Sequence, residues 1–130
     1  MLNLFYIEDH KDECKPFIDV IQLAGAARLI DTHVECVHGL DALGAGPLCD
    51  AILLDAELGK GIQHTLGWVM ANWERMPPII MVTNHVGYEA DFLRAGAQRF
   101  WHKPDVIQHP QIFVDSVNQV VIRCRFHRPL

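Results

Sequence analysis

The sequence feature that most constrains the fold is a set of short, largely apolar runs that each end at a polar or charged residue. Clear runs span residues 2–7, 51–54 and 78–82, and weaker ones span residues 33–37 and 99–102. The clear runs have no helical period, and buried parallel strands have this composition. We therefore predict five strands.

Helical patterns separate these runs. Apolar residues recur at intervals of three and four over residues 14–21, 66–73 and 113–124, and shorter helical candidates span residues 41–45 and 88–95. Strands that alternate with helices favour one parallel sheet covered on both faces, with right-handed crossovers. The predicted fold class is α/β with three layers, a five-stranded parallel sheet flanked by five helices.

Length and composition indicate a single domain over residues 1–130. Half of these residues are hydrophobic, which is enough for a core without disulfide or metal support. A formal net charge of -5 argues against direct nucleic-acid binding. Residues 1–10 lack the basic start of a signal peptide, and no apolar run approaches the roughly 20 residues that cross a bilayer. We expect a soluble, cytoplasmic protein without membrane contact.

The cysteines and histidines form no recognisable metal or redox motif. Cys14, Cys36, Cys49 and Cys124 show neither C-x-x-C spacing nor the crowding of a disulfide-rich domain. The eight histidines are scattered, without the spacing of a zinc site. We expect reduced and mostly buried thiols.

One edge of the predicted sheet gathers polar side chains. The residues just past the first, third, fourth and fifth strands are Glu8 with Asp9, Asp55, Thr83 and Lys103. Ligand sites in parallel sheets lie beyond the carboxyl ends of the strands, so we expect these residues to converge. Three carboxylates held close favour a cation, and oxygen ligands suit Mg²⁺. A hydroxyl and an ammonium group beside that cation would complete a pocket for a phosphoryl group.

Each of these residues also has an ordinary interpretation when taken alone. A carboxylate at a strand end is commonly solvated or caps a helix, and a lysine there is most often exposed. The conjunction favours a common site, because an acidic pair, an aspartate, a hydroxyl and a lysine each follow a strand of their own.

The sequence resembles the receiver domains of two-component response regulators over essentially its whole length. The segments FYIEDH, AILLDAEL, IIMVTN and GAQRFWHKPD carry the resemblance. It implies a flavodoxin-like receiver fold and a role in phosphorelay signal transduction, with Asp55 as the phosphoacceptor. Thr83 and Lys103 would contact the phosphoryl group, and Phe100 would be the aromatic switch residue that responds to movement of Thr83.

The resemblance also implies a cofactor and partners. The magnesium ligands would be Glu8, Asp9, Asp55 and the backbone carbonyl of Glu57. A sensor histidine kinase or a phosphotransfer protein would supply the phosphoryl group. A downstream effector protein, or a lost effector domain, would respond to the switched surface.

The loop after the expected phosphoacceptor departs from the family pattern and leaves an alternative open. Gly59 and Gly61 supply the turn there in place of the family's usual residues. A degenerate receiver that binds partners independently of phosphorylation is the alternative function. An enzyme is disfavoured, because the turn after the first strand has no glycine to admit a pyrophosphate. Glu57 is only a loose counterpart of the second carboxylate that haloacid-dehalogenase-type phosphatases need, so we expect catalysis only of the domain's own phosphoryl transfer and dephosphorylation.

Overall fold

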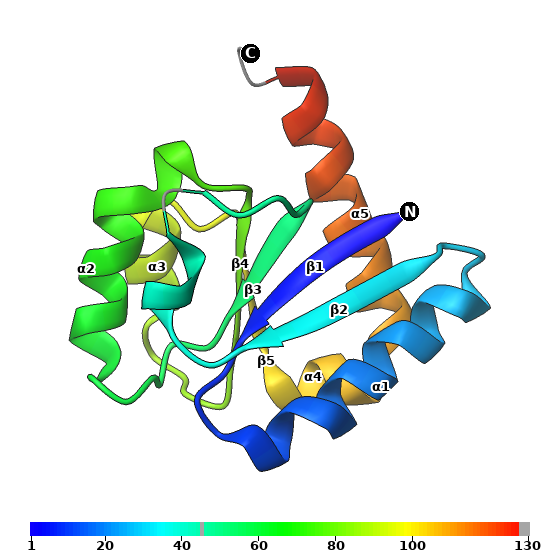
Figure 1. Ribbon diagram of the computed structural model, residues 1–130, viewed down its shortest axis with the longest axis horizontal. Helices are drawn as coiled ribbons and strands as arrows, with labels where there is room; N and C mark the ends of the chain where they lie inside the picture. Colours follow the sequence, from blue (N-terminus) through cyan, green and yellow to red (C-terminus); the bar gives the residue numbers. More distant parts are fainter. Residues whose placement is uncertain (45, 128–130) are drawn as a thin grey trace.

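The computed structural model describes residues 1–44 and 46–127 and contains one five-stranded sheet (Figure 1). The strands are β1 (Leu2–Ile7), β2 (Thr32–Val37), β3 (Ala51–Leu54), β4 (Ile79–Thr83) and β5 (Arg99–His102). Their spatial order is β2-β1-β3-β4-β5, and all neighbouring pairs are parallel. The predicted parallel sheet is confirmed.

Five α-helices cover the two faces of this sheet. They are α1 (Lys11–Ala27), α2 (Ile62–Asn72), α3 (Glu89–Ala95), α4 (Lys103–Gln108) and α5 (Pro110–His127), with short 3₁₀ turns η1 (Leu40–Leu43) and η2 (Trp73–Arg75). Helices α1, α4 and α5 lie on one face, and α2 and α3 lie on the other with η1 (Figure 1). The three-layer α/β architecture is therefore confirmed. None of the described helices is both long and apolar enough to cross a membrane.

Two helices differ from the prediction. The helix predicted over residues 41–45 is the single 3₁₀ turn η1, in which Leu40 and Leu43 are both buried, and Ala45 lies outside the described residues. Residues three apart share one side of a 3₁₀ turn, so four residues suffice to bury both leucines. The structure also contains a short helix that was not predicted, α4, which ends before His109; helical geometry is disfavoured for the residue before Pro110, so α4 and α5 are separate helices.

Side-chain alternation along β1 decides which helical layer each residue meets. Leu2, Leu4 and Tyr6 pack in the core under α1 and α5, whereas Ile7 packs in the core under α2 and α3. Successive strand residues point to opposite faces, so consecutive residues at the end of β1 leave it in opposite directions.

The cysteine prediction is wrong for one pair. Cys14, on the first turns of α1, is joined by a disulfide to Cys36 on β2, with a Cα–Cα distance of 6.3 Å. That spacing lies inside the range a disulfide accepts. The crossover from β1 packs α1 against β2, which brings together residues that are 22 positions apart in the sequence. Cys49 and Cys124 are free, as predicted.

Candidate functional site

A buried lysine joins two carboxylates at the carboxyl edge of the sheet. Lys103, the first residue of α4, places its Nζ 2.8 Å from Asp55 Oδ2 and 2.7 Å from Glu8 Oε2. The three side chains are 7%, 7% and 0% exposed, respectively. Buried charges are tolerated only when they are paired. The structure therefore brings together three of the predicted site residues, which come from the ends of β1, β3 and β5.

Glu8 is further held by residues that were not among the predicted site residues. The Tyr6 hydroxyl donates to Glu8 Oε2 at 3.1 Å, and the His10 backbone N–H donates to Oε1 at 3.0 Å. With Lys103, these donors engage both Glu8 oxygens. Tyr6 lies on β1 two residues before Glu8, which directly follows the strand, and this spacing was the available sequence signal for a shared face.

Burial and pairing set the protonation of this cluster. Burial, aided by the neighbouring Glu8, raises the pKa of Asp55 to about 6, although Lys103 partly offsets the rise. Burial also acts on Glu8, but hydrogen bonds with Asp55 and Lys103 outweigh it and hold the Glu8 pKa below its usual range. Hydrogen bonds to both carboxylates likewise keep the pKa of Lys103 above its ordinary value despite burial. At neutral pH the cluster holds two carboxylates and one ammonium group.

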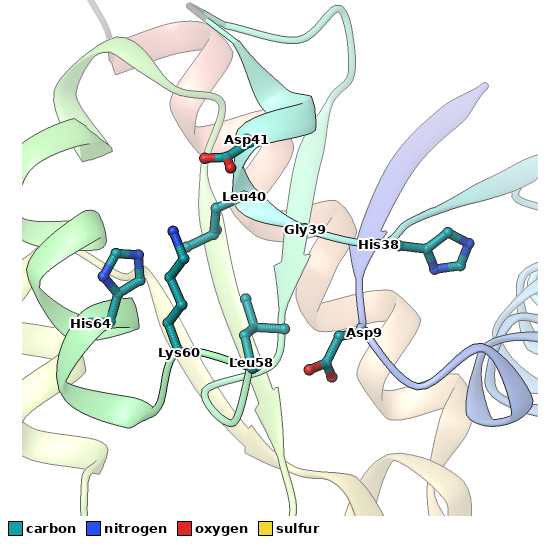
Figure 2. A pocket seen from close by; sticks show the side chains of 9 residues that line it. Asp9, His38, Gly39, Leu40, Asp41, Leu58, Lys60 and His64 are labelled. Atoms are coloured by element: carbon teal, nitrogen blue, oxygen red, sulfur yellow. The ribbon is translucent and has the colours of Figure 1, made fainter.

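Asp9 lies apart from this cluster and lines a cavity of about 190 Å³. Figure 2 shows its carboxylate pointing into the cavity, with Leu58 and Lys60 opposite and His38 turned away. Asp9 Oδ1 is buried and accepts no hydrogen bond within the described chain, although His10 Nδ1 lies 3.0 Å away. Within residues 1–44 and 46–127, no hydrogen bond or ion pair joins Asp9 to Asp55.

This orphaned oxygen fits a cation site. Buried polar atoms nearly always have a partner, so a carboxylate oxygen without a donor is a ready ligand for a hard cation. Asp9 also lines a second cavity, of about 580 Å³, together with Glu57, and this cavity has room for the waters, roughly 30 Å³ each, that a hydrated Mg²⁺ requires. Of the predicted metal ligands, Asp9 fits best, whereas Glu8 would have to give up donors that it already engages.

Two hydrogen bonds and one side-chain contact link Asp55 to Thr83 through two loops. The Glu57 N–H donates to Asp55 Oδ1 at 2.9 Å, and Glu57 Oε1 lies 3.3 Å from His85 Nδ1. The His85 N–H donates to the buried Thr83 hydroxyl at 3.1 Å. A change in charge at Asp55 therefore has a short path of contacts to Thr83.

Thr83 and Phe100 lie on the same face of the sheet. Met81 pairs with Phe100 in the β4–β5 register, and Thr83 follows Met81 by two residues. Phe100 is half-buried against the core under α2 and α3, with its ring centroid 6.2 Å from that of Phe92. The register of β4 and β5 thus places the predicted switch residues, Thr83 and Phe100, on the face of the sheet that α3 covers.

Comparison with known proteins identifies the architecture. No family model and no curated protein sequence match this chain. Among solved structures, a two-component response regulator from Clostridium difficile is 17% identical with a TM-score of 0.71, covering 92% of this chain and 97% of that one. The response regulatory domain of mrkE from Klebsiella pneumoniae is 14% identical with a TM-score of 0.70, covering 94% and 99%. The chain has the receiver-domain fold.

A third receiver-fold structure carries ligands. It is a response regulator protein from Burkholderia pseudomallei, described with a phosphorylated aspartic acid, a calcium ion and citrate. It is 16% identical with a TM-score of 0.62, covering 100% of this chain and 76% of that one. The resemblance inferred from the sequence is therefore confirmed at the level of the fold.

The raised pKa of Asp55 predicts an unusual effect of its removal. Asp55→Asn should raise the free energy of unfolding of the metal-free protein at pH 7, by roughly 1 to 3 kcal/mol, because each pKa unit corresponds to about 1.4 kcal/mol. The folded-state pKa of about 6 exceeds the ordinary 3.8, so the folded parent binds more protons between these values. Parent stability should fall as pH rises through this window, and urea unfolding from pH 4 to 7 would show the two proteins diverging.

Asp91→Asn is the matched control, because the Asp91 side chain is 45% exposed and, among the described residues, its ion-pair partner is Arg94 on the surface of α3. It should leave the pH profile of the parent unchanged. An Asp55→Asn protein that is less stable than the parent throughout this pH range would contradict the assigned burial cost.

Proposed function

We propose that this chain is a response-regulator receiver domain that accepts a phosphoryl group on Asp55 with Mg²⁺. The observation that carries the proposal is Lys103, buried between Asp55 and Glu8, at the same edge of the sheet as the buried Oδ1 of Asp9. A nucleophile, a fixed ammonium and a cation ligand are the groups that phosphoryl transfer requires. The phosphorylated aspartate and the calcium ion of the Burkholderia structure support the same reading.

The chemistry follows from the charges. Asp55 is ionised above its pKa of about 6, so at neutral pH its carboxylate can attack phosphorus while the donor's leaving group departs with the bonding electron pair. Lys103 stays protonated and can transfer a hydrogen bond from a carboxylate to a phosphoryl oxygen. A bound Mg²⁺, held by Asp9, Asp55 and the carbonyl of Glu57, would neutralise developing charge on the other phosphoryl oxygens. Glu8 is the remaining candidate ligand, and it also keeps Lys103 in place.

Access to Asp55 requires the loops around it to move. Its side chain is only 7% exposed, and its Oδ1 accepts the N–H of Glu57, whose side chain contacts His85. Separation of that pair would admit a donor and would also free the Thr83 hydroxyl, to which the His85 N–H donates. We propose that Thr83 then turns toward the phosphoryl group and that Phe100 moves with it. This motion would shift a two-state surface formed by α3, β5 and the helices after β5.

The expected partners follow from this role. A sensor histidine kinase or a phosphotransfer protein would donate the phosphoryl group, and an effector would bind the switched surface. The protein would work in the cytoplasm and would catalyse only its own modification.

One observation favours the alternative of a degenerate receiver. Both oxygens of Asp55 already accept hydrogen bonds within the chain, from Lys103 and from the Glu57 N–H. A protein locked in this arrangement would bind partners without phosphorylation. The following experiment separates the two functions.

Acetyl phosphate and Mg²⁺ should add one phosphoryl group to the protein, EDTA should prevent the addition, and Asp55→Asn should abolish it. Intact mass spectrometry measures the product, and peptide mapping locates it. Asp50→Asn is the matched control, because Asp50 is at the opposite end of the same strand, where its Oδ2 accepts the Asn3 N–H. Undiminished modification of Asp55→Asn would refute the assignment, and an unmodified parent would favour the degenerate receiver.

Thr83→Ala should still be phosphorylated but should fail to move Phe100. NMR spectra of parent and variant, with and without acetyl phosphate, report this as the phosphorylation shifts over β5 and α3. Thr65→Ala is a control, because Thr65 is also buried but bonds to Gly61 at the start of α2. Identical shifts in the parent and Thr83→Ala would show that Thr83 does not couple the site to Phe100.

A further inference from the structure

We propose that Cys14 and Cys36 form a reversible thiol–disulfide site whose oxidation state sets the order of the loop that carries Glu8 and Asp9, and thereby its affinity for a divalent cation. The thiol–disulfide chemistry is argued from the positions of Cys14, Cys36 and His38 alone. The effect on cation binding rests on the function proposed above.

Both sulfur atoms lie against the backbone of this loop. Cys14 Sγ is 3.7 Å from the carbonyl oxygen of His10 and 4.0 Å from that of Glu8. Cys36 Sγ is 3.9 Å from His38 Nδ1, which in turn lies 3.2 Å from the Glu8 carbonyl oxygen. The disulfide therefore connects the start of α1 to the end of β2 directly around residues 8–10.

The pair is placed for exchange with a small disulfide. Cys36 is half-buried and its neighbour His38 is exposed, whereas Cys14 is buried at 6% exposure. Cys36 is thus the accessible sulfur, and Cys14 is the resolving partner behind it. The His38 ring N–H is also close enough to stabilise a Cys36 thiolate, the form that attacks.

The exchange balances with a low-molecular-weight disulfide as the oxidant. The Cys36 thiolate attacks one sulfur of the reagent, forms a mixed disulfide and releases one small thiolate. The Cys14 thiolate then attacks Cys36 Sγ, forms the Cys14–Cys36 bond and releases the second thiolate. The two protein thiols together lose two electrons and two protons, the reagent disulfide gains the two electrons, and the two protons protonate the two released thiolates.

The two oxidation states give the loop different partners. In the disulfide, neither cysteine carries an S–H group that can donate a hydrogen bond, and Cys36 has no negative charge to attract a donor. The His38 ring N–H therefore donates to the Glu8 carbonyl alone. In the dithiol, Cys14 can donate to the His10 carbonyl, and the His38 N–H can turn to the Cys36 thiolate. The covalent bridge also limits motion of α1 against β2.

A loop that is ordered in advance loses less conformational entropy when it binds a cation. The oxidised protein should therefore bind Mg²⁺ more tightly than the reduced protein. Couplings between two sites are commonly at least about fivefold in affinity, and we expect a difference of that size.

The test uses the full chain equilibrated with either glutathione disulfide or excess reduced glutathione. Intact mass and thiol alkylation report the bridge, and Mg²⁺ titration followed by NMR gives the dissociation constant. Oxidation should remove two hydrogen atoms and lower that constant about fivefold or more.

The double variant Cys14→Ser, Cys36→Ser should show one affinity under both conditions. The matched control is Cys49→Ser, Cys124→Ser, which should behave as the parent, because burial raises the pKa of the Cys49 thiol to about 11.

Several results would overturn the proposal. These are a bridge that excess glutathione cannot reduce, thiols that glutathione disulfide does not oxidise, or equal Mg²⁺ affinity in the two states. Zn²⁺ held by the two thiolates and His38 so tightly that it blocks oxidation would make this a metal site instead. If Mg²⁺ binds neither state, the proposed function fails. The redox site is then tested by measuring amide hydrogen exchange of residues 8–10 in the metal-free protein. Equal exchange rates in the oxidised and reduced states would refute it.

Discussion

The interaction on which the site depends is one buried ammonium group shared by two buried carboxylates. Lys103 holds Asp55 and Glu8 at distances of 2.7 to 2.8 Å, and the three side chains come from different strand ends. Loss of the lysine would leave two carboxylates uncompensated in the interior, and breaking such a buried cluster typically costs 3–5 kcal/mol. The same arrangement keeps an excess of negative charge at neutral pH, which favours a further cation.

The surrounding structure maintains this charge at some cost to stability. Burial makes ionised Asp55 unfavourable, and the buried Asp9 Oδ1 accepts no hydrogen bond among the described residues, with the His10 ring nitrogen 3.0 Å away. Both features lower the stability of the folded protein, so a purely structural cluster has no use for them, but they suit a site that binds and releases ligands. The Glu57 N–H donates to Asp55, the Glu57 side chain contacts His85, and the His85 N–H donates to Thr83, so the two loops beyond β3 and β4 connect Asp55 to Thr83.

Much of this could be predicted from the sequence, because apolar runs locate buried strands and the residue after each run must lie at one edge of a parallel sheet. The contacts that residues make beyond the strand ends could not be predicted from the sequence. The acidic pair splits, with Glu8 toward Lys103 and Asp9 toward a separate cavity, since consecutive residues leave a strand in opposite directions. The contacts of Tyr6 and His10, and the Cys14–Cys36 bond, depend on how α1 packs, which no local pattern specifies.

A crystal structure of the protein with Mg²⁺ and beryllium trifluoride, which mimics a phosphoryl group on a carboxylate, tests the central claim most directly. The account predicts beryllium bonded to Asp55, Lys103 Nζ moved onto a fluoride, and the cation between Asp9 and Asp55. A structure in which Lys103 still bridges Asp55 and Glu8, with neither the fluoride group nor the cation bound at Asp55, would contradict it.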